Sequence, residues 1–427
     1  GFCLVSDLLD ADVEQARADA ALLAHARARV EALARAGTRA AWLHRARRWN
    51  ARDRVWMGWE RKRGKLEDLN AYLVDGAARF AIVAGDPLAL RGVRFVITVD
   101  EDMGLQPGAV RRLIAVMAHP LQRACYDPAR GRVIAGHGVL QPRMTPTDVD
   151  RPTRYGRLLA WLWGKPAADP DDVPLWSDVY QDLLGEGTFY GKGIYDLAVF
   201  HRCLDQRFAD DQILSHDMLE GSVVRSGQIN DVQLLEDIPA TYLAACARHH
   251  RWMRGDWQLV RFLAPRIRDA RGARVRNPIS VAGRWRILDN ARRMLVAPAT
   301  IACLAVGWLA APRPGAWTLC VLALVVGPAL VDLVDAARRR GVVAMARHAP
   351  VAGAHVALGF VFMAHDALTT LDAIARASVR LWVTGRGLLE WVPFQQANRR
   401  ATPGLVGHYR AMARSVVAVA ALAGALA

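Results

Sequence analysis

Two uncharged apolar runs in the last third of the chain constrain its fold more than any other feature. Residues 294–311 and residues 316–331 carry no charged side chain, and a short turn that contains Pro312 and Gly315 joins them. Each run is close to the length that an α-helix needs to cross the ~30 Å hydrocarbon core of a bilayer. The two runs therefore predict a transmembrane hairpin, which we place within residues 284–340.

Arginines flank this hairpin unevenly and indicate its orientation. Seven of them lie just outside its two ends, whereas the turn between the runs holds only Arg313. Cytoplasmic segments next to membrane spans are enriched in arginine and lysine. Both ends of the hairpin, and with them residues 1–283, are therefore predicted to face the cytoplasm.

The region after residue 340 is apolar with interruptions. Charged residues such as Asp366 and Asp372 divide residues 341–410 at intervals that leave an aliphatic stripe. We expect this region to form amphipathic helices at the membrane face, with a further buried hairpin as the alternative. Residues 411–427 are expected to begin another transmembrane helix. Because the chain stops inside that apolar run, we expect it to be part of a larger protein.

The charge and the cysteines narrow the range of partners. A net charge of +15 over 427 residues is compatible with nucleic acid, an anionic membrane or a phosphorylated substrate. The arginines lie beside membrane segments and in alanine-rich helices, without the interleaved aromatic residues of a nucleic-acid-binding face, so no nucleic acid is expected. The six cysteines are scattered. They indicate neither a disulfide framework nor a zinc site.

The first 283 residues show an α/β pattern. A short apolar strand at residues 2–5 leads through an acidic turn into a long helix, and RFVITV at residues 94–99 is expected to form a buried parallel strand. That strand ends at Asp100 and Asp102, and ligands bind at the carboxyl edge of parallel sheets. Paired carboxylates there suit Mg²⁺ or Mn²⁺ held together with a diphosphate. Upstream, Lys62 lies near a helix N-terminus, a position suited to phosphate oxygens.

Residues 213–257 concentrate the remaining reactive side chains. Asp217 and Glu220 lie about one helical turn apart. Some thirty residues on, Arg248, Arg251 and Trp252 belong to a basic aromatic cluster. Such a cluster suits a polar, charged, ring-shaped substrate better than a packed core.

Glycines at positions 185, 187, 191 and 193 bracket Phe189 and Tyr190. They predict a tight loop in which the backbone comes close to a ligand or to another part of the chain. Because these glycines neither follow a strand nor open a helix, we reject a dinucleotide-binding fingerprint.

In their order along the chain, these motifs resemble the membrane-embedded, processive GT-A glycosyltransferases related to cellulose synthase. More closely, VWMGWERKRGKLEDLN, GEGTFYGKGIYD, ILSHDMLEG and HRWMRGDWQ are similar to the glycosyltransferase module of cyclic β-1,2-glucan synthases. The resemblance implies a Rossmann-like GT-A domain at residues 1–283, whose first nucleotide-binding strand would lie upstream of Gly1. It implies inverting transfer of glucose from UDP-glucose to a glucan acceptor at the bacterial inner membrane. It further implies phosphorylase-like domains after the membrane region.

The resemblance assigns roles on the donor side. Asp7 would contact the uridine and Lys62 the diphosphate, while Asp100 and Asp102 would bind the nucleotide sugar and the Mg²⁺ or Mn²⁺ ion.

On the acceptor side, the resemblance makes Asp217 the catalytic base that takes the proton of the acceptor hydroxyl. Glu220 is the rival base, or it orients Asp217 or pairs with a neighbouring arginine. Arg251 and Trp252 match the family's RW motif. Arg248 stands where cellulose synthase has glutamine, so the role of that position stays open between the acceptor and the diphosphate.

Two other classes of function remain as alternatives. One is a different membrane polysaccharide synthase, for an osmoregulated periplasmic glucan or a cellulose-like polymer, because the β-1,2 linkage rests on the resemblance alone. The other is a non-enzymatic membrane transporter, which would leave some 290 residues of α/β domain with clustered acids unexplained.

Overall fold

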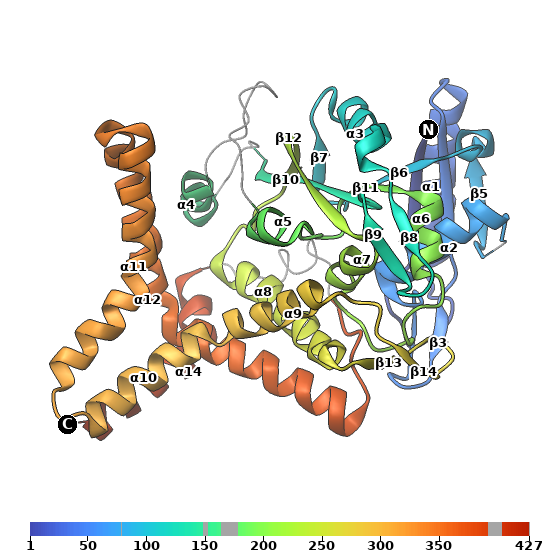
Figure 1. Ribbon diagram of the computed structural model, residues 1–427. Coiled ribbons are helices and arrows are strands. Elements are labelled where there is room, and N and C mark those ends of the chain that lie inside the picture. The colour runs from blue at the N-terminus through green and yellow to red at the C-terminus, as the bar shows by residue number, and fades with distance from the viewer. Residues whose placement is uncertain (78, 148–152, 164–177, 392–403, 427) are drawn as a thin grey trace.

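The chain folds into a mixed α/β part with two main sheets and a set of long apolar helices beside it (Figure 1). The computed structural model describes residues 1–77, 79–147, 153–163, 178–391 and 404–426. A mixed α/β fold followed by apolar helices agrees with the expectation from the sequence, whereas the GT-A assignment stays a prediction.

A three-stranded sheet forms from the N-terminal residues. Strand β1 (Phe2–Asp7) pairs in parallel with β2 (Ala40–Arg45), and β5 (Ile82–Gly85) pairs antiparallel with the other edge of β2. Helix α1 (Asp19–Arg35) connects β1 to β2 and packs on β2 and β5. The parallel register places Asp7 opposite Arg45, where both strands end.

A five-stranded sheet lies at the centre of the α/β part, in the order β6-β11-β10-β12-β7. Its strands are β6 (Phe95–Thr98), β7 (Met103–Leu105), β10 (Val139–Pro146), β11 (Gly193–Asp196) and β12 (Ser226–Glu236). Only β10 and β12 run parallel, and the other three pairs are antiparallel.

The expectation that residues 94–99 form a parallel strand is therefore wrong. Strand β6 is an edge strand that runs antiparallel to β11. Its neighbour β11 begins at Gly193, at the end of the glycine-rich loop, and runs back along β6, so that Gly193 pairs with Thr98 and Asp196 with Phe95.

Side chains alternate between the two faces of this sheet, and each face carries its own apolar cluster. Val139 and Tyr195 belong to the larger cluster, in which helices α6 (Leu197–Leu204) and α7 (Asp217–Val224) take part. Leu140 and Ile194, their neighbours in sequence, belong to the cluster formed with helix α3 (Ala109–Ala118). The sheet is thus covered by helices on both faces.

The remaining described elements of the α/β part are short strands and helices that connect or cover these sheets. They are β3 (Arg48–Asn50), β4 (Val55–Met57), α2 (Arg61–Asp75), β8 (Cys125–Asp127), β9 (Arg132–Ala135), α4 (Arg154–Trp163), α5 (Val179–Leu184), α8 (Tyr242–Gln258), β13 (Arg266–Arg268), β14 (Arg274–Arg276) and α9 (Val281–Met294).

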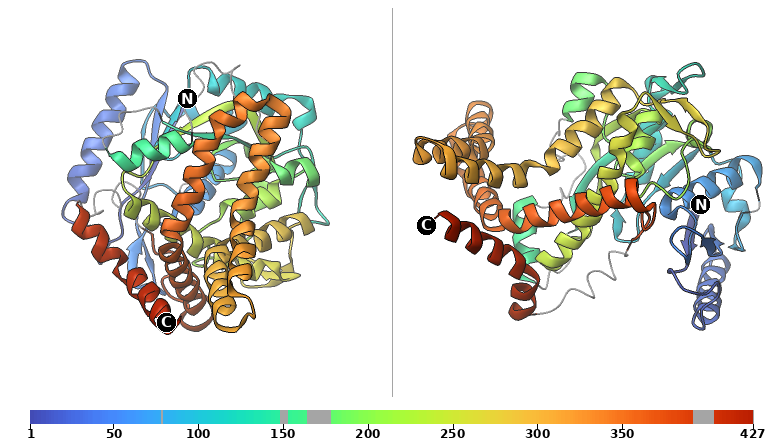
Figure 2. Two further views of the ribbon diagram at one scale, coloured as in Figure 1. Left: turned by 90° about the vertical axis from the view of Figure 1, so that its left-hand side faces the viewer. Right: turned by 90° about the horizontal axis from the view of Figure 1, so that it is seen from below.

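The two uncharged runs form helices α10 (Val296–Ala310) and α11 (Pro314–Arg340), which pack against each other. Both project away from the α/β part, on the side opposite to the N-terminus (Figures 1 and 2). Helix α11, and the helical segment Val342–Thr384 that follows it, are long and apolar enough to cross a membrane. Helices α9 and α10 pass the same test together but are bent by 50°. The described residues thus hold two candidate spans, or three if the bent pair is one span.

The region at residues 341–410, where we expected amphipathic helices at the membrane face, begins with one 38-residue helix, α12 (Val342–Val379). Helix α14 (Leu405–Leu426) starts within the same range. Residues 392–403 lie outside the described residues.

The charges that suggested a polar face on α12 have protein partners. Asp366 accepts a hydrogen bond from the Tyr242 hydroxyl at 2.9 Å, and Asp372 lies 2.8 Å from His250 Nε2. Because Tyr242 and His250 belong to α8, these carboxylates bind the α/β part and do not require a water-facing side of the helix.

Candidate functional site

The site begins where strand β6 ends beside the start of β11. The antiparallel register pairs Thr98 with Gly193, so Gly191 and Lys192 come next to Asp100. Lys62, in the first turn of α2, contacts one carboxylate oxygen of Asp100 and donates a hydrogen bond to the Gly191 carbonyl at 2.8 Å. Lys192 Nζ lies 3.5 Å from the other carboxylate oxygen of Asp100.

A glycine in the first turn of α2 brings Lys62 to this position. A Cβ on Gly64 would lie 2.1 Å from the Trp59 carbonyl oxygen. Only glycine therefore lets the start of the helix pack this closely against the loop before it.

Gly191 connects the Asp100 end of the site with Asp217. Its φ of +77° is in the left-handed region, and a Cβ on it would lie 2.3 Å from Asp217 Oδ1. The Asp217 carboxylate therefore lies directly against the Gly191 backbone, whose carbonyl binds Lys62. The structure thus brings Asp217 and Asp100 into one site, and the glycine-rich loop is a place of close backbone approach, as the sequence indicated.

Lys192 is the cation that the acidic groups of the site share. Burial by itself would lower the pKa of Lys192, but the carboxylates of Glu236, Asp100, Asp217 and Asp102 outweigh this effect and raise it. The Lys192 ammonium lies 3.5 Å from Glu236 Oε1. Lys192 therefore lies where the charges of four carboxylates act together.

The charges around Asp102 bear on the predicted metal site at Asp100 and Asp102. Burial, followed by the negative charges of Asp100 and Glu236, raises the pKa of Asp102. Burial acts in the same direction on Asp100, but Lys62 and Lys192 hold its pKa below the usual value. Carboxylate oxygens are ligands that Mg²⁺ and Mn²⁺ prefer, and a divalent cation would relieve the repulsion at Asp102. The donor set therefore fits the predicted ion.

Asp7 lies in an ion-pair network at the carboxyl ends of β1 and β2. Its two oxygens accept hydrogen bonds from Arg45 at 2.8 and 2.9 Å, and Arg45 also binds Asp68 at 2.9 Å. Lys65 Nζ is 3.9 Å from Asp7, and the negative charges of both Asp7 and Asp100 act on it. Lys65 thus connects the predicted uridine contact with the predicted diphosphate contacts.

The predicted acceptor residues lie on α8, at positions i, i+3 and i+4 of one helix face. The Arg248 guanidinium lies 4.8 Å over the Trp252 ring and 3.7 Å from Glu236. The Arg251 guanidinium lies 5.5 Å over the Trp391 ring. Burial lowers the pKa of Arg251 to about 10, with Arg248 acting in the same direction and Asp100 and Asp102 against it. Arg248 and Arg251 therefore face the acidic end of the site.

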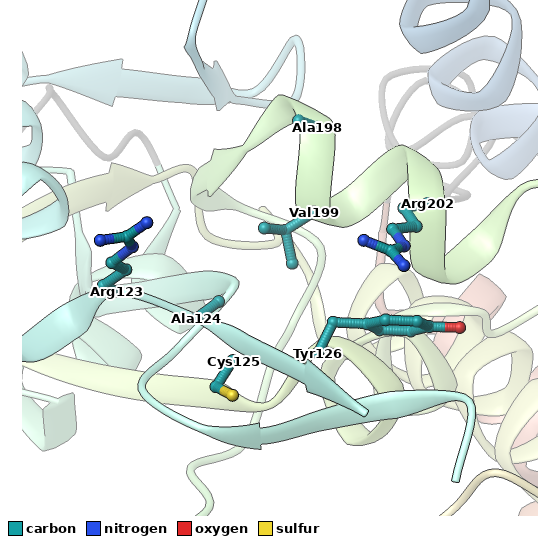
Figure 3. Close-up of a pocket in the computed structure, with 7 residues that line it drawn as sticks. All are labelled: Arg123, Ala124, Cys125, Tyr126, Ala198, Val199 and Arg202. Carbon is teal, nitrogen blue, oxygen red and sulfur yellow. The ribbon is translucent and has the colours of Figure 1, made fainter. Parts of the chain in front are cut away.

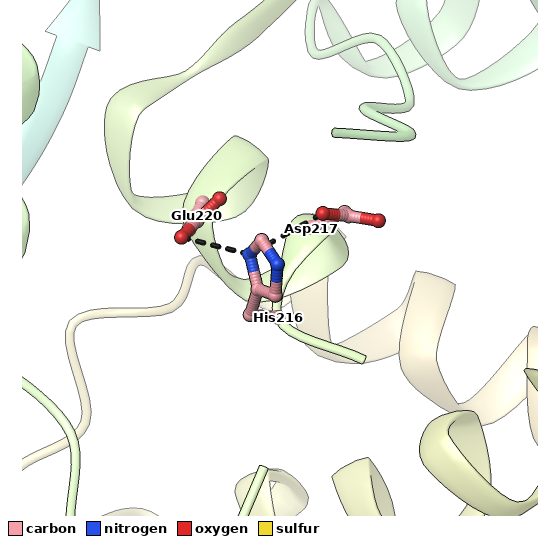
Figure 4. Close-up of side chains that lie close together, drawn as sticks. All are labelled: His216, Asp217 and Glu220. Atoms are coloured by element: carbon pink, nitrogen blue, oxygen red, sulfur yellow. Dashed lines mark ion pairs between the residues drawn. The ribbon is translucent and has the colours of Figure 1, made fainter. Parts of the chain in front are cut away.

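His216 joins the two carboxylates of α7 (Figure 4). Its Nδ1 lies 2.9 Å from Glu220 Oε1 and 3.3 Å from Asp217 Oδ1. Burial alone would lower the pKa of His216, but Glu220 and Asp217 raise it. Protonated imidazole donates from both nitrogens and has no lone pair for a metal ion. These three side chains lie close enough to hold a metal ion, and the raised pKa of His216 means that a proton would compete with such an ion for Nδ1.

A separate cavity of about 540 Å³ opens between β8 and α6 and is lined by Arg123, Cys125, Tyr126, Val199 and Arg202 among others (Figure 3). The Arg202 guanidinium lies 4.5 Å over the Tyr126 ring. None of the residues predicted to belong to the site lines this cavity.

Comparison with known proteins supplies the family. No protein-family model matches the chain. The chain is 37% identical over 429 residues to the cyclic β-(1,2)-glucan synthase NdvB of Rhizobium meliloti strain 1021, a match that covers 96% of the chain. The chain is a cyclic β-glucan synthase-related protein. This synthase-related chain spans 15% of the length of that relative. The match confirms the resemblance that the sequence motifs indicated.

The sequence of this synthase-related protein did not predict that Lys192 and Glu236 belong to the site. Lys192 lies inside the glycine-rich loop, where its spacing from Asp100 gives no hint of contact, because the contact depends on the antiparallel return of β11. Glu236 ends β12 beside β7, in register with Met103. The sequence does show that Glu236 is an acidic residue at the end of a strand, like Asp100. It does not show which strands are neighbours in the sheet, so it could not place Glu236 in the site.

Proposed function

We propose that this chain is the glucosyl-transferring part of a membrane-bound glucan synthase, which moves glucose from UDP-glucose to a growing β-glucan with inversion at the anomeric carbon. The observation that carries the proposal is the junction at Gly191, which places the carboxylate of Asp217 against the loop that binds Lys62 beside Asp100. A sugar bound at this junction would lie next to the base, Asp217, and next to the residues that bind the leaving diphosphate, Lys62 and Asp100. The relationship to a cyclic β-(1,2)-glucan synthase supports a glucan as product.

Positive side chains on three elements would stabilise the departing UDP. Lys62 on α2, Lys192 before β11 and Arg251 on α8 all interact with Asp100. A Mg²⁺ or Mn²⁺ ion held by Asp100 and Asp102 would supply further charge neutralisation at the diphosphate. Such preorganised charges accelerate transfer because they match charge that develops as the bond breaks.

Asp217 is the better placed of the two candidate bases. Its side chain is 30% exposed, whereas that of Glu220 is 4% exposed and bound to His216. An acceptor hydroxyl could therefore reach Asp217, while Glu220 and His216 orient it. A positioned general base contributes roughly 10²–10⁴-fold to such a step.

Trp252 supports the assignment of an acceptor subsite. Trp252 is 42% exposed, and the Arg248 guanidinium lies over its ring. A flat aromatic face suits the apolar face of a glucose ring. Helix α8, which carries Trp252, packs against α12, one of the candidate membrane spans, so the acceptor would lie next to the bilayer. The arginine distribution favours the cytoplasmic side of a bacterial inner membrane.

The proposal is tested with the full-length synthase that carries this sequence, assayed in membranes with labelled UDP-glucose. We expect Asp217→Asn to lose nearly all glucan synthesis, because an amide cannot accept the hydroxyl proton. Asp231→Asn, an exposed acid on β12, is the matched control and should keep full activity. Near wild-type synthesis by Asp217→Asn would remove the base from the mechanism. Linkage analysis of the wild-type product separates a β-1,2-glucan from a cellulose-like or other polymer, and no product from UDP-glucose would favour a transporter.

A further inference from the structure

A small polar cavity lies behind the His216–Glu220 pair. It has a volume of about 20 Å³, and its polar lining consists of Arg63, Glu67, Asn70, His201, Asp205 and Glu220. A cavity of roughly 10–15 Å³ or more with several polar groups holds a water molecule. This one therefore has room for one water between α2, α6 and α7.

The proposed reaction creates a need for a proton exit at this place. In each transfer, the acceptor oxygen forms a bond to the anomeric carbon, the bond from that carbon to the diphosphate breaks, and the acceptor proton moves to Asp217. Asp217 must then lose that proton before it can accept the next one. A processive enzyme repeats this step for every glucose unit, with polymer and donor covering the open side of the base.

The first part of an exit path runs through His216. Its Nδ1 lies 3.3 Å from Asp217 Oδ1 and 2.9 Å from Glu220 Oε1. Nδ1 is buried and not aligned with either oxygen for a hydrogen bond, so the imidazole must turn slightly for each transfer. Starting from the imidazolium, Nδ1–H passes its proton to Glu220 and leaves neutral imidazole, and the same nitrogen then takes the proton from Asp217. The net result is a neutral Glu220 and a regenerated Asp217 carboxylate, with His216 unchanged.

The second part crosses the cavity to Glu67. Glu220 is 3% exposed, and its Oε2 is buried without a hydrogen-bond partner among the described residues. Both Glu220 and Glu67 line the cavity. The Tyr195 hydroxyl donates to Asn70 at 2.7 Å and fixes the polar wall between them. Because Oε2 has no hydrogen bond to hold it, the neutral carboxyl is free to make a half-turn that brings its protonated oxygen to the cavity. One water there would then carry the proton to Glu67.

Glu67 is suited to exchange that proton near neutral pH. Burial raises the pKa of Glu67 to about 7, with Asp205 and Asp210 acting in the same direction and Arg63 and the Gln206 backbone N–H against it. A group with a pKa near the working pH both accepts and releases protons readily. Asp205, at the end of α6, is exposed and also lines the cavity, so solvent is the final acceptor.

We propose that His216, Glu220, the water-sized cavity and Glu67 form the route by which the proton collected by Asp217 leaves for solvent after each transfer. The proposal rests on the proposed glucosyl transfer and assigns to Glu67, a residue without substrate contact, the role of a proton acceptor. Glu67 is thus a positioning and relay residue for the base.

The test compares Glu67→Gln with Asp210→Asn in the full-length synthase. Both changes remove one carboxylate that interacts with Arg63, at 3.4 Å for Glu67 and 3.1 Å for Asp210, but Asp210 does not line the cavity. We expect Glu67→Gln to lower kcat about tenfold, less than the loss of the base itself, with an unchanged KM for UDP-glucose and a larger solvent deuterium isotope effect. Asp210→Asn removes one of the weaker charges that act on Glu67 but leaves the Glu67 carboxyl in place. It should therefore keep the wild-type KM and stay within twofold of the wild type in kcat and isotope effect.

The relay would be overturned by a kcat for Glu67→Gln within twofold of the control, or by a lower kcat accompanied by a higher KM. In either case, glucan synthesis by the wild type would still support the proposed function. Absence of synthesis by the wild type would instead reject the proposed function itself. If the glutamine variant does not accumulate, Glu67→Asp replaces it. Aspartate keeps the carboxyl, but its shorter side chain leaves that carboxyl farther from the water in the cavity. This variant should then show a normal KM with an isotope effect above that of the wild type, and an isotope effect equal to the wild type's would overturn the relay.

Discussion

A methyl group on Gly191 should disable the site, beyond the loss of stability that alanine causes at any exposed glycine with a similar backbone conformation. Gly191→Ala would place a Cβ 2.3 Å from Asp217 Oδ1, well inside van der Waals contact, and would force alanine into a backbone conformation with φ of +77°. Holding alanine in this left-handed conformation lowers the free energy of unfolding by about 1–2 kcal/mol. The contact must also move the Asp217 carboxylate by about 1 Å, and a misplacement of that size can cost ~10²-fold in rate.

The matched control separates these two effects. Gly272 has a φ of +79°, and a Cβ on it would meet nothing within 4 Å. Gly272→Ala should therefore lose a similar free energy of unfolding but keep its kcat. Initial rates of glucan synthesis and UDP affinity would be measured for both variants in the same membranes. Equal kcat values for Gly191→Ala and Gly272→Ala would refute the contact between the loop and the base.

Two further predictions concern the metal ion and the pH dependence of stability. Asp102→Ala should abolish the increase of the rate with added Mg²⁺ or Mn²⁺, and a wild-type response to the ion would contradict the assignment of Asp102. Arg47 holds the pKa of Asp19 below its usual value, mainly through a side-chain hydrogen bond. A carboxyl whose pKa is lower in the folded than in the unfolded protein stabilises the fold above the unfolded pKa of about 3.9, and this stabilisation is lost as the pH falls through the folded pKa. Asp19→Asn should therefore be less stable than the wild type at pH 7. Denaturation at a series of pH values should show that difference shrinking below about pH 4, and a constant difference would contradict the pairing.

The sequence predicted those parts of the site that depend on short segments. The strand before Asp100, the helix after Lys62 and the turn between Asp217 and Glu220 are local, and periodicity or motif spacing reports them. The juxtaposition of Asp100 with Asp217 came from the order of the motifs and the family resemblance, since no local pattern relates residues more than a hundred positions apart.

What the sequence did not predict depends on pairing between distant elements. Strand β6 has the composition of a buried parallel strand, yet its neighbour β11 runs antiparallel, and only that direction places Lys192 beside Asp100. Helix α12 is a second case. The spacing of Asp366 and Asp372 is typical of the polar side of a surface helix, but both carboxylates bind side chains of α8. A charge pattern on one helix cannot show whether water, headgroups or another helix satisfies it.

The attachment of α8 to α12 has a practical consequence for this protein. Tyr242 and His250 of α8 bind Asp366 and Asp372, and the Trp257 indole donates to Ser378 at 3.0 Å. Trimming the polypeptide to its first 283 residues would strip these partners from the helix that bears Trp252, and would leave its apolar flank open to solvent. Water-soluble fragments are therefore poor surrogates for kinetic work, and lipid nanodiscs holding the intact polypeptide are the natural preparation.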